Sequence, residues 1–166
     1  PKPRLVMSQT IEDKIVNHFI ANYYLLPYLE NKLIDSNVAT RTGKGSKYAN
    51  ALLVKYIKNI ILKNKNTEIY CLKLDISKYF YHISHSKILD MIKVSIKDKD
   101  VINLLSLCIS ETNKDYINNS VDYYNKKYNV SIPYYQKGYG LSIGAMTSQF
   151  LSIFQDFGLF FLFIGK

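Results

Sequence analysis

The pattern of apolar and polar positions along the chain predicts a protein made mostly of helices. Apolar residues recur every three or four positions, the spacing that places them on one face of an α-helix. Thr10, with Asp13 in the following turn, is a typical cap for the first of these helices. The predicted helices are a pair within residues 11–34 and single helices around 49–61, 86–94, 101–109 and 146–163.

Two other segments predict strands. Residues 69–76 form a short apolar run bounded by polar residues, which is typical of a strand. Residues 112–138 are rich in Asn, Tyr and Lys and show no helical stripe, and within them 129–132 and 134–136 could pair as a hairpin. The order of helices, strand, helices, hairpin and helix predicts an α+β fold with a small antiparallel sheet.

Composition narrows the class of protein. The 166 residues are 48% hydrophobic, which excludes a disordered chain and predicts one domain with a core. The 22 Lys and Arg outnumber the 13 Asp and Glu, for a net charge of +9, and favour nucleic acid as a partner ahead of an acidic membrane surface. Cys71 and Cys108 make no disulfide framework, so we expect a reducing, cytoplasmic compartment.

Both ends of the chain indicate a piece of a larger protein or an open reading frame that ends abnormally. The first residues contain no Met and no signal peptide, and residues 157–166 form an apolar run too short to span a bilayer. We expect this run to need further chain to bury it.

Four segments are candidates for chemistry. Asp75 follows the predicted strand, where a carboxylate is costly unless it is paired or bound to metal, although it could equally cap a helix. Residues 140–149 place small residues before a helix, which lets the backbone approach a ligand but also suits an ordinary turn. Arg4 and Arg41 are the two arginines of the chain, and each lies in one of the remaining segments.

The order of these four segments resembles that of the reverse transcriptases, over essentially the whole chain. Residues 3–14 resemble the first block of that family, 40–45 the second, 72–85 palm motif A and 140–149 motif B. The sequence of motif B is similar to that of bacterial enzymes, especially those of diversity-generating retroelements. Group II intron enzymes are more distant relatives. The resemblance implies a truncated right-hand polymerase with fingers at 1–68, palm at 69–111, a hairpin or insertion at 112–138 and the motif B turn with a palm helix at 139–166.

The resemblance also implies roles for individual residues. Asp75, with the backbone carbonyl of Ile76, would bind two catalytic Mg²⁺ (or Mn²⁺) ions. Phe80 would lie under the sugar of the incoming dNTP and exclude a 2′-hydroxyl. The other implied nucleotide contacts are Lys2, Arg4, Lys78, Tyr79, Ile143 and Gly144. The implied template and primer contacts are Arg41, Lys44, Ser148 and Gln149.

The chain departs from the family in two places. It has no pair of adjacent aspartates, whereas the family carries a Tyr-x-Asp-Asp hairpin after motif B, so we do not expect this chain to polymerise alone. Ile143 stands where many relatives have Gln, which removes a polar nucleotide contact. The implied partners are an RNA template, a DNA or RNA primer and, in addition, a retroelement RNA or an accessory protein, with no membrane.

Two other functions compete with an RNA-directed DNA polymerase. One is a non-catalytic RNA-binding derivative or decayed fragment of the same fold, and the other is an unrelated basic helical module that binds nucleic acid through lysines. The tyrosines and lysines of residues 116–135 could stack bases and bind phosphate, but a partly exposed insertion covering the palm is the favoured interpretation. His82 and His85 have no further ligand at zinc-site spacing, so zinc is not expected.

Overall fold

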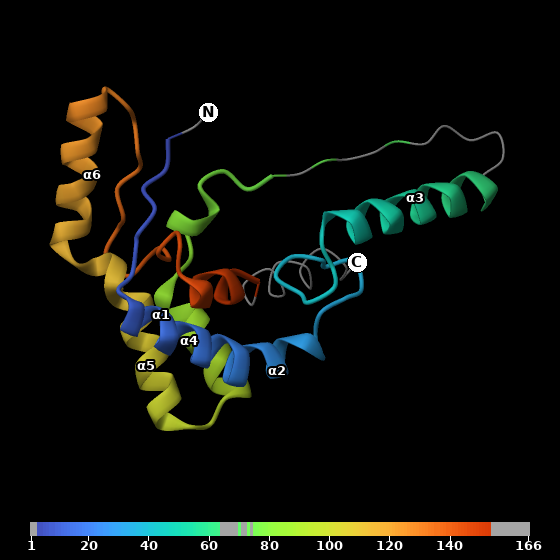
Figure 1. Ribbon diagram of the computed structural model, residues 1–166, viewed down its shortest axis with the longest axis horizontal. Coiled ribbons are helices and arrows are strands. Elements are labelled where there is room, and N and C mark those ends of the chain that lie inside the picture. The colour runs from blue at the N-terminus through green and yellow to red at the C-terminus, as the bar shows by residue number, and fades with distance from the viewer. Residues whose placement is uncertain (1–2, 64–69, 71–72, 74, 154–166) are drawn as a thin grey trace. The chain divides into compact units, whose positions relative to one another are not determined.

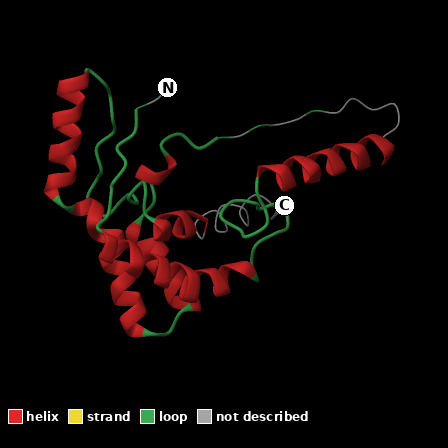
Figure 2. Ribbon diagram, in the orientation of Figure 1, coloured by secondary structure: helices red, strands yellow, loops and turns green. Residues whose placement is uncertain are grey.

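The computed structural model describes residues 3–63, 70, 73 and 75–153, and this part of the chain is built from helices joined by loops (Figures 1 and 2). Residues 146–153 form a further helical stretch after the last labelled helix. The α-helices are α1 (Ile11–Ile20), α2 (Leu26–Glu30), α3 (Ser46–Lys63), α4 (His85–Ser95), α5 (Lys99–Ser110) and α6 (Asp115–Tyr128). A π-helical turn η1 (Ala21–Leu25) and two 3₁₀ turns, η2 (Tyr79–Tyr81) and η3 (Glu111–Asn113), connect them.

The prediction of an α+β fold, with polymerase fingers and a partial palm built around a small antiparallel sheet, is wrong for the described part of the chain. There the regular elements are all helices and no β-strand is present (Figure 2). Extended pairing in this part of the chain is limited to two isolated bridges, Arg41 with Lys44 and Ser84 with Tyr139. The predicted strand at 69–76 lies largely outside the described residues, and its described members are not in a strand.

The predicted hairpin of 129–132 with 134–136 is also wrong, because these residues form no strand. The expectation of no helix within 112–138 is wrong as well, because α6 occupies the first half of that segment. The extended chain after α6 runs back along the helix and pairs with it through side chains (Figure 1). Asn118 and Asn125, seven positions apart on one face of α6, each exchange two hydrogen bonds with a backbone unit. Asn118 binds the N–H and carbonyl of Tyr135 at 2.9 Å each, and Asn125 binds those of Ile132 at 2.7 and 3.0 Å. These amides satisfy backbone groups that a second strand would otherwise satisfy.

The helices predicted from apolar spacing are confirmed at α1, α2, α3, α4 and α5 and over residues 146–153. The predicted remainder of the last helix, 154–163, lies outside the described residues. Thr10 caps α1 as predicted, because its hydroxyl oxygen accepts a hydrogen bond from the Asp13 N–H at 3.2 Å. No helix in the described ranges is both long and apolar enough to cross a membrane.

The chain divides into two compact units. Unit 1 consists of Pro1–Leu29 and Lys78–Lys166, and unit 2 is the intervening segment Glu30–Ser77. Unit 1 holds the described core, whose largest fully buried side chains come from α1, η1, α4 and the residues that flank it, α5, α6 and the 138–153 segment. These side chains are Ile20, Leu25, Ile83, Ile88, Ile92, Ile96, Leu105, Ile109, Val121, Leu141 and Leu151. In unit 2, α3 buries none of its residues.

A buried polar pair joins α1 to the helical stretch at 146–153. The Thr147 hydroxyl donates to the side-chain oxygen of Asn17 at 2.5 Å, and the Asn17 amide donates to the Asp13 carbonyl at 2.8 Å. Both side chains are more than 95% buried. The pair therefore ties two segments that are 130 positions apart in the sequence.

Replacing Thr147 by valine should lower the free energy of unfolding by about 1–2 kcal/mol, because the isosteric side chain leaves the buried Asn17 oxygen without its donor. Urea denaturation followed by circular dichroism would measure this change. Thr147→Ser keeps the hydroxyl and serves as the matched control. A Val variant no less stable than the Ser variant would show that the hydrogen bond contributes nothing.

Candidate functional site

Three of the four sequence blocks meet in unit 1. The Met7 N–H donates to the Ile143 carbonyl at 2.8 Å, which joins the first block to motif B. Motif B in turn pairs with the end of motif A, because the Leu141 N–H donates to the Phe80 carbonyl and the Gly140 N–H to the Ile83 carbonyl, both at 2.8 Å. The backbones of the 3–10 segment, η2 and the 140–144 turn therefore form one hydrogen-bonded assembly.

Gly144 allows the closest of these approaches. Its φ of +115° lies in the region that side chains rarely adopt, and a Cβ built there would lie 2.8 Å from the Met7 carbonyl oxygen and 3.0 Å from a Val6 methyl. Gly144 does admit a close neighbour, although the prediction for this segment was the approach of a ligand. The neighbour is the N-terminal segment of the same chain, and the implied contact between Gly144 and a nucleotide stays a prediction.

An apolar cluster packs against this hydrogen-bonded assembly. Tyr81, Ile117 and Tyr135 are buried together, and the rings of the two tyrosines lie 4.6 Å apart between centroids. The side chains of Ile143, Leu5 and Met7 are partly buried and pack against this cluster. Ile143 therefore contributes to packing, where Gln would place an amide against two aromatic rings.

The cluster brings the charge of Arg4 close to η2. Burial raises the pKa of Tyr81, and the positive charge of Arg4 opposes the rise. Burial likewise raises the pKa of Tyr135, whose hydroxyl donates to the Leu141 carbonyl at 3.3 Å. Arg4 itself is exposed, so its guanidinium is available to an anion beside η2.

The turn at residues 78–81 presents the residues that the resemblance assigns to the nucleotide. Lys78 has a left-handed backbone with φ +54° and ψ +33°, which reverses the chain before η2, and its side chain is exposed. The Tyr79 hydroxyl donates to the Ser152 carbonyl at 2.6 Å, which ties the turn to the helical stretch at 146–153. Phe80 is half-buried and meets Tyr79 edge to face, with ring centroids 6.0 Å apart.

A buried histidine network holds the other end of the 138–141 segment. The His85 Nε2 lies 2.7 Å from the Gly140 carbonyl oxygen, and the Thr112 hydroxyl donates to the same oxygen at 2.9 Å. Asn113 accepts from the Gly138 N–H at 2.7 Å, and its amide nitrogen lies 3.5 Å from His85 Nδ1. Burial lowers the pKa of His85, and the bond to Gly140 opposes that change.

The residues implied as metal ligands lie in unit 2. Asp75 and Ile76 are both exposed. Among the residues that the structure describes, no three His, Cys, Asp or Glu side chains gather closely enough to hold a metal ion. A two-magnesium site needs several carboxylates to balance about four positive charges. The donor set around Asp75 therefore does not fit such a site.

Arg41 and Lys44, the implied template contacts of unit 2, are bonded within their own loop. Arg41 forms an ion pair with Glu30 at 2.7 Å and donates to the Ile34 and Asn37 carbonyls at 3.2 and 3.1 Å, and its side chain is only 8% exposed. Lys44 forms an ion pair with Asp35 at 2.5 Å. The hydrogen bond from Arg41 lowers the pKa of Glu30. Arg41 thus organises the loop, and its binding to template stays a prediction.

The remaining implied contacts differ in exposure. The Ser148 side chain is buried, and its hydroxyl lies 3.1 Å from that of Ser142, whereas Gln149 is exposed. Lys2 lies outside the described residues. Ser148 therefore stabilises the motif B turn internally, and Gln149 is the member of this pair that a ligand can reach.

Sequence reasoning missed the buried polar residues that position the site, namely Asn17, Thr112 and Thr147, and gave His85 no role. A signal was available for Asn17, which lies three positions before Ile20 and four before Ala21, on the buried side of α1 and its continuation. A polar side chain on a buried helix face requires a partner. The identity of that partner, 130 positions away, was not readable from spacing.

Comparisons with known proteins give no identification. No family model, no curated protein and no solved structure matches the chain.

Proposed function

We propose that the chain supplies the nucleotide- and template-contacting surface of an RNA-directed DNA polymerase of the bacterial retroelement type. The supporting observation is the backbone pairing of Met7 with Ile143 and of Phe80 with Leu141, at 2.8 Å each. It gathers the first block, the end of motif A and motif B at one place in unit 1. The resemblance assigns nucleotide contacts to the same three segments.

The chemistry available there is anion binding. Arg4 offers a planar fork of donors that matches phosphate oxygens, and Lys78 adds a second exposed positive charge on the η2 turn. Gln149 is exposed and offers an amide for a base or a backbone phosphate. This surface can bind a nucleotide but does not catalyse its transfer, because the donor set around Asp75 does not fit the two metal ions that nucleotidyl transfer needs.

Replacing Arg4 by glutamine should weaken the binding of dATP by about tenfold, since a charge-assisted bidentate contact contributes about 1.5–3 kcal/mol. Isothermal titration calorimetry with dATP in Mg²⁺ buffer would measure the change, with deoxyadenosine as the ligand that lacks phosphate. Lys97→Gln, on an exposed lysine between α4 and α5, removes the same charge elsewhere in unit 1. Equal affinity for dATP and deoxyadenosine, or an Arg4 variant that behaves as the Lys97 control, would reject the assignment.

A non-catalytic RNA-binding derivative of the same fold is the second candidate. The lack of a metal-holding group of side chains among the described residues and the lack of adjacent aspartates in the sequence favour it. Extension of a primer on an RNA template distinguishes the two functions. Extension by the complete protein that Asp75→Ala abolishes would support a polymerase, whereas binding of template and primer by both proteins without extension would support the derivative.

A further inference from the structure

A second surface, on α6, carries an unusual number of exposed aromatic rings. Tyr116, Tyr123 and Tyr128 of α6 and Tyr134 of the following segment are 54, 54, 58 and 53% exposed. We call these four residues with Lys127 the tyrosine face. Rings are usually at least half-buried in a core, and a cluster left in solvent marks an interaction site.

The part of the tyrosine face around Tyr123 and Lys127 is not needed to hold α6 in place. The buried side of the helix consists of Ile117 and Val121, and Asn118 and Asn125 bind the returning chain. Tyr116 donates to Glu111 and Tyr134 to Asp122, whereas Tyr123 and Lys127, four positions apart, lie on a different side of the helix from its buried residues. Their replacement should therefore leave the fold intact, which makes the surface suitable for a mutational test.

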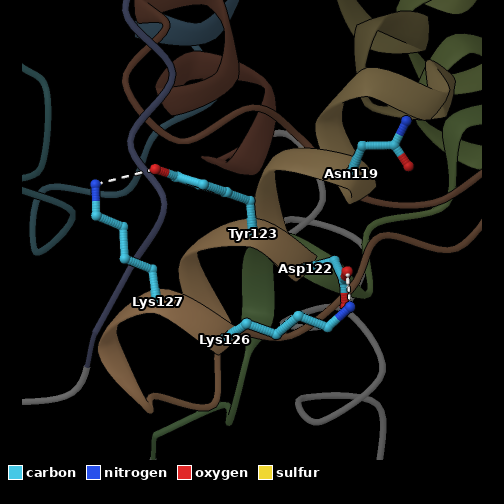
Figure 3. Close-up of a pocket in the computed structure, with 5 residues that line it drawn as sticks. All are labelled: Asn119, Asp122, Tyr123, Lys126 and Lys127. Atoms are coloured by element: carbon cyan, nitrogen blue, oxygen red, sulfur yellow. Dashed lines mark hydrogen bonds and ion pairs between the residues drawn. The ribbon is translucent and has the colours of Figure 1, made fainter.

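Lys127 is held by aromatic rings and not by a carboxylate. Its Nζ lies 5.2 Å from the centroid of the Tyr123 ring and 5.4 Å from that of Tyr128, and it donates to the Tyr123 hydroxyl at 3.0 Å (Figure 3). Among the described residues no carboxylate forms an ion pair with it, whereas the neighbouring Lys126 pairs with Asp122 at 2.6 Å. The charge of Lys127 is therefore fixed between two rings and is not neutralised.

A shallow depression of about 500 Å³ lies beside these groups. Its lining combines the Tyr123 ring and the two lysines with Asp122 and the exposed amide of Asn119 (Figure 3). The lining thus offers an aromatic surface, a cation and hydrogen-bonding groups together, which are the three kinds of contact that a nucleotide unit of a single strand makes.

We propose that the tyrosine face binds single-stranded nucleic acid, with bases stacked on the exposed tyrosine rings and a backbone phosphate on Lys127. Stacking on aromatic side chains is the main source of affinity for unpaired bases, and the chain's net charge of +9 favours a polyanion over an acidic or neutral protein surface. The surface shares none of its residues with the nucleotide site, so it adds a binding site to the proposed function and does not depend on it.

Fluorescence anisotropy with a labelled oligouridylate RNA and the full chain tests the proposal. Tyr123→Leu should weaken binding about tenfold, the effect expected for the loss of one stacked base, while Tyr123→Phe keeps the ring and should retain most of the affinity. Lys127→Gln should weaken binding and reduce the slope of log affinity against log salt by about one. Tyr23→Leu, at a similarly exposed tyrosine of η1, is the matched control and should leave binding unchanged.

Two further measurements complete the experiment. An abasic oligonucleotide of the same length should bind wild type more weakly than the RNA does, and Tyr123→Leu should not weaken it further. Equal wild-type affinity for both oligonucleotides, or equal RNA affinity of wild type and Tyr123→Leu, would overturn the proposal. A third result would also overturn it: light scattering shows that the wild type is a dimer, and Tyr123→Leu dissociates this dimer without changing RNA binding. The dATP titration of Arg4→Gln is a separate readout, so either proposal can fail alone.

Discussion

Gly144→Ala is expected to lower the free energy of unfolding by about 3 kcal/mol. The new methyl group meets the Met7 carbonyl oxygen at 2.8 Å, and that oxygen belongs to the backbone and cannot rotate away. The backbone at φ +115° adds conformational strain to this overlap. Strain of this kind costs about 1–3 kcal/mol and overpacking a similar amount.

Gly138→Ala separates the two causes. Gly138 has φ +80° and nothing within 4 Å of the position where its Cβ would lie, so this variant carries the strain without the overlap. Urea denaturation of both variants should show a loss of about 1 kcal/mol at Gly138 and a clearly larger loss at Gly144. Hydrogen exchange should also accelerate at the Met7 amide in Gly144→Ala, because the bond from Met7 to Ile143 is displaced. Equal losses in the two variants would show that the close approach of the N-terminal segment contributes nothing.

The helices of this protein were predictable wherever apolar residues alone hold them in place. Ile88 and Ile92 of α4 and Leu105 and Ile109 of α5 are fully or almost fully buried at a spacing of four. That regular spacing is visible in the sequence. Their contribution is hydrophobic and does not depend on which residue lies opposite.

Helix α6 was not predictable in the same way, because half of what holds it is polar. Its apolar contribution is limited to Ile117 and Val121, and Asn118 and Asn125 supply the rest through hydrogen bonds to the backbone at Tyr135 and Ile132. Asn favours turns and caps by its local preferences. In α6 the asparagines instead bind the backbone of the chain that returns along the helix, and this contact cannot be predicted from local preferences.

The sequence predicted which segments contribute to the candidate site, but it did not predict which residues contact each other there. The small residues of motif B do admit a close neighbour, but Gly144 receives Met7, and Arg41 binds Glu30 within its own loop. A sequence motif records that a position must be small or cationic. Which group such a residue contacts depends on the segments that fold against it. For Arg41, a nearby carboxylate and two backbone carbonyls already accept hydrogen bonds from the guanidinium.

The second large effect concerns His85. His85→Leu should lower the free energy of unfolding by about 2 kcal/mol at pH 8. Leucine fills a similar volume, but it removes the N–H that donates to the Gly140 carbonyl. The Thr112 hydroxyl still donates to that oxygen, which limits the loss. Urea denaturation at several pH values between 5 and 8 would measure both the loss and its pH dependence.

The pH dependence follows from the direction of the pKa shift. Burial lowers the pKa of His85 below 6.5 in the folded protein, so the unfolded chain binds a proton more readily than the folded one does. Stability from the neutral imidazole is therefore complete above about pH 6.5 and is lost as the pH falls toward the folded-state pKa. The difference between wild type and His85→Leu should shrink over that interval.

The geometry explains why the folded protein keeps His85 neutral. The Gly138 N–H binds the side-chain oxygen of Asn113, and this bond turns the Asn113 amide nitrogen toward His85 Nδ1. Protonation would place an N–H at Nδ1 against the N–H₂ group of Asn113, two donors facing each other in a buried site. His82→Gln is the control, since His82 is exposed and its loss should leave the wild-type pH dependence in place. A His85→Leu protein whose stability declines below pH 6.5 as steeply as that of wild type would contradict the assignment of this titration to His85.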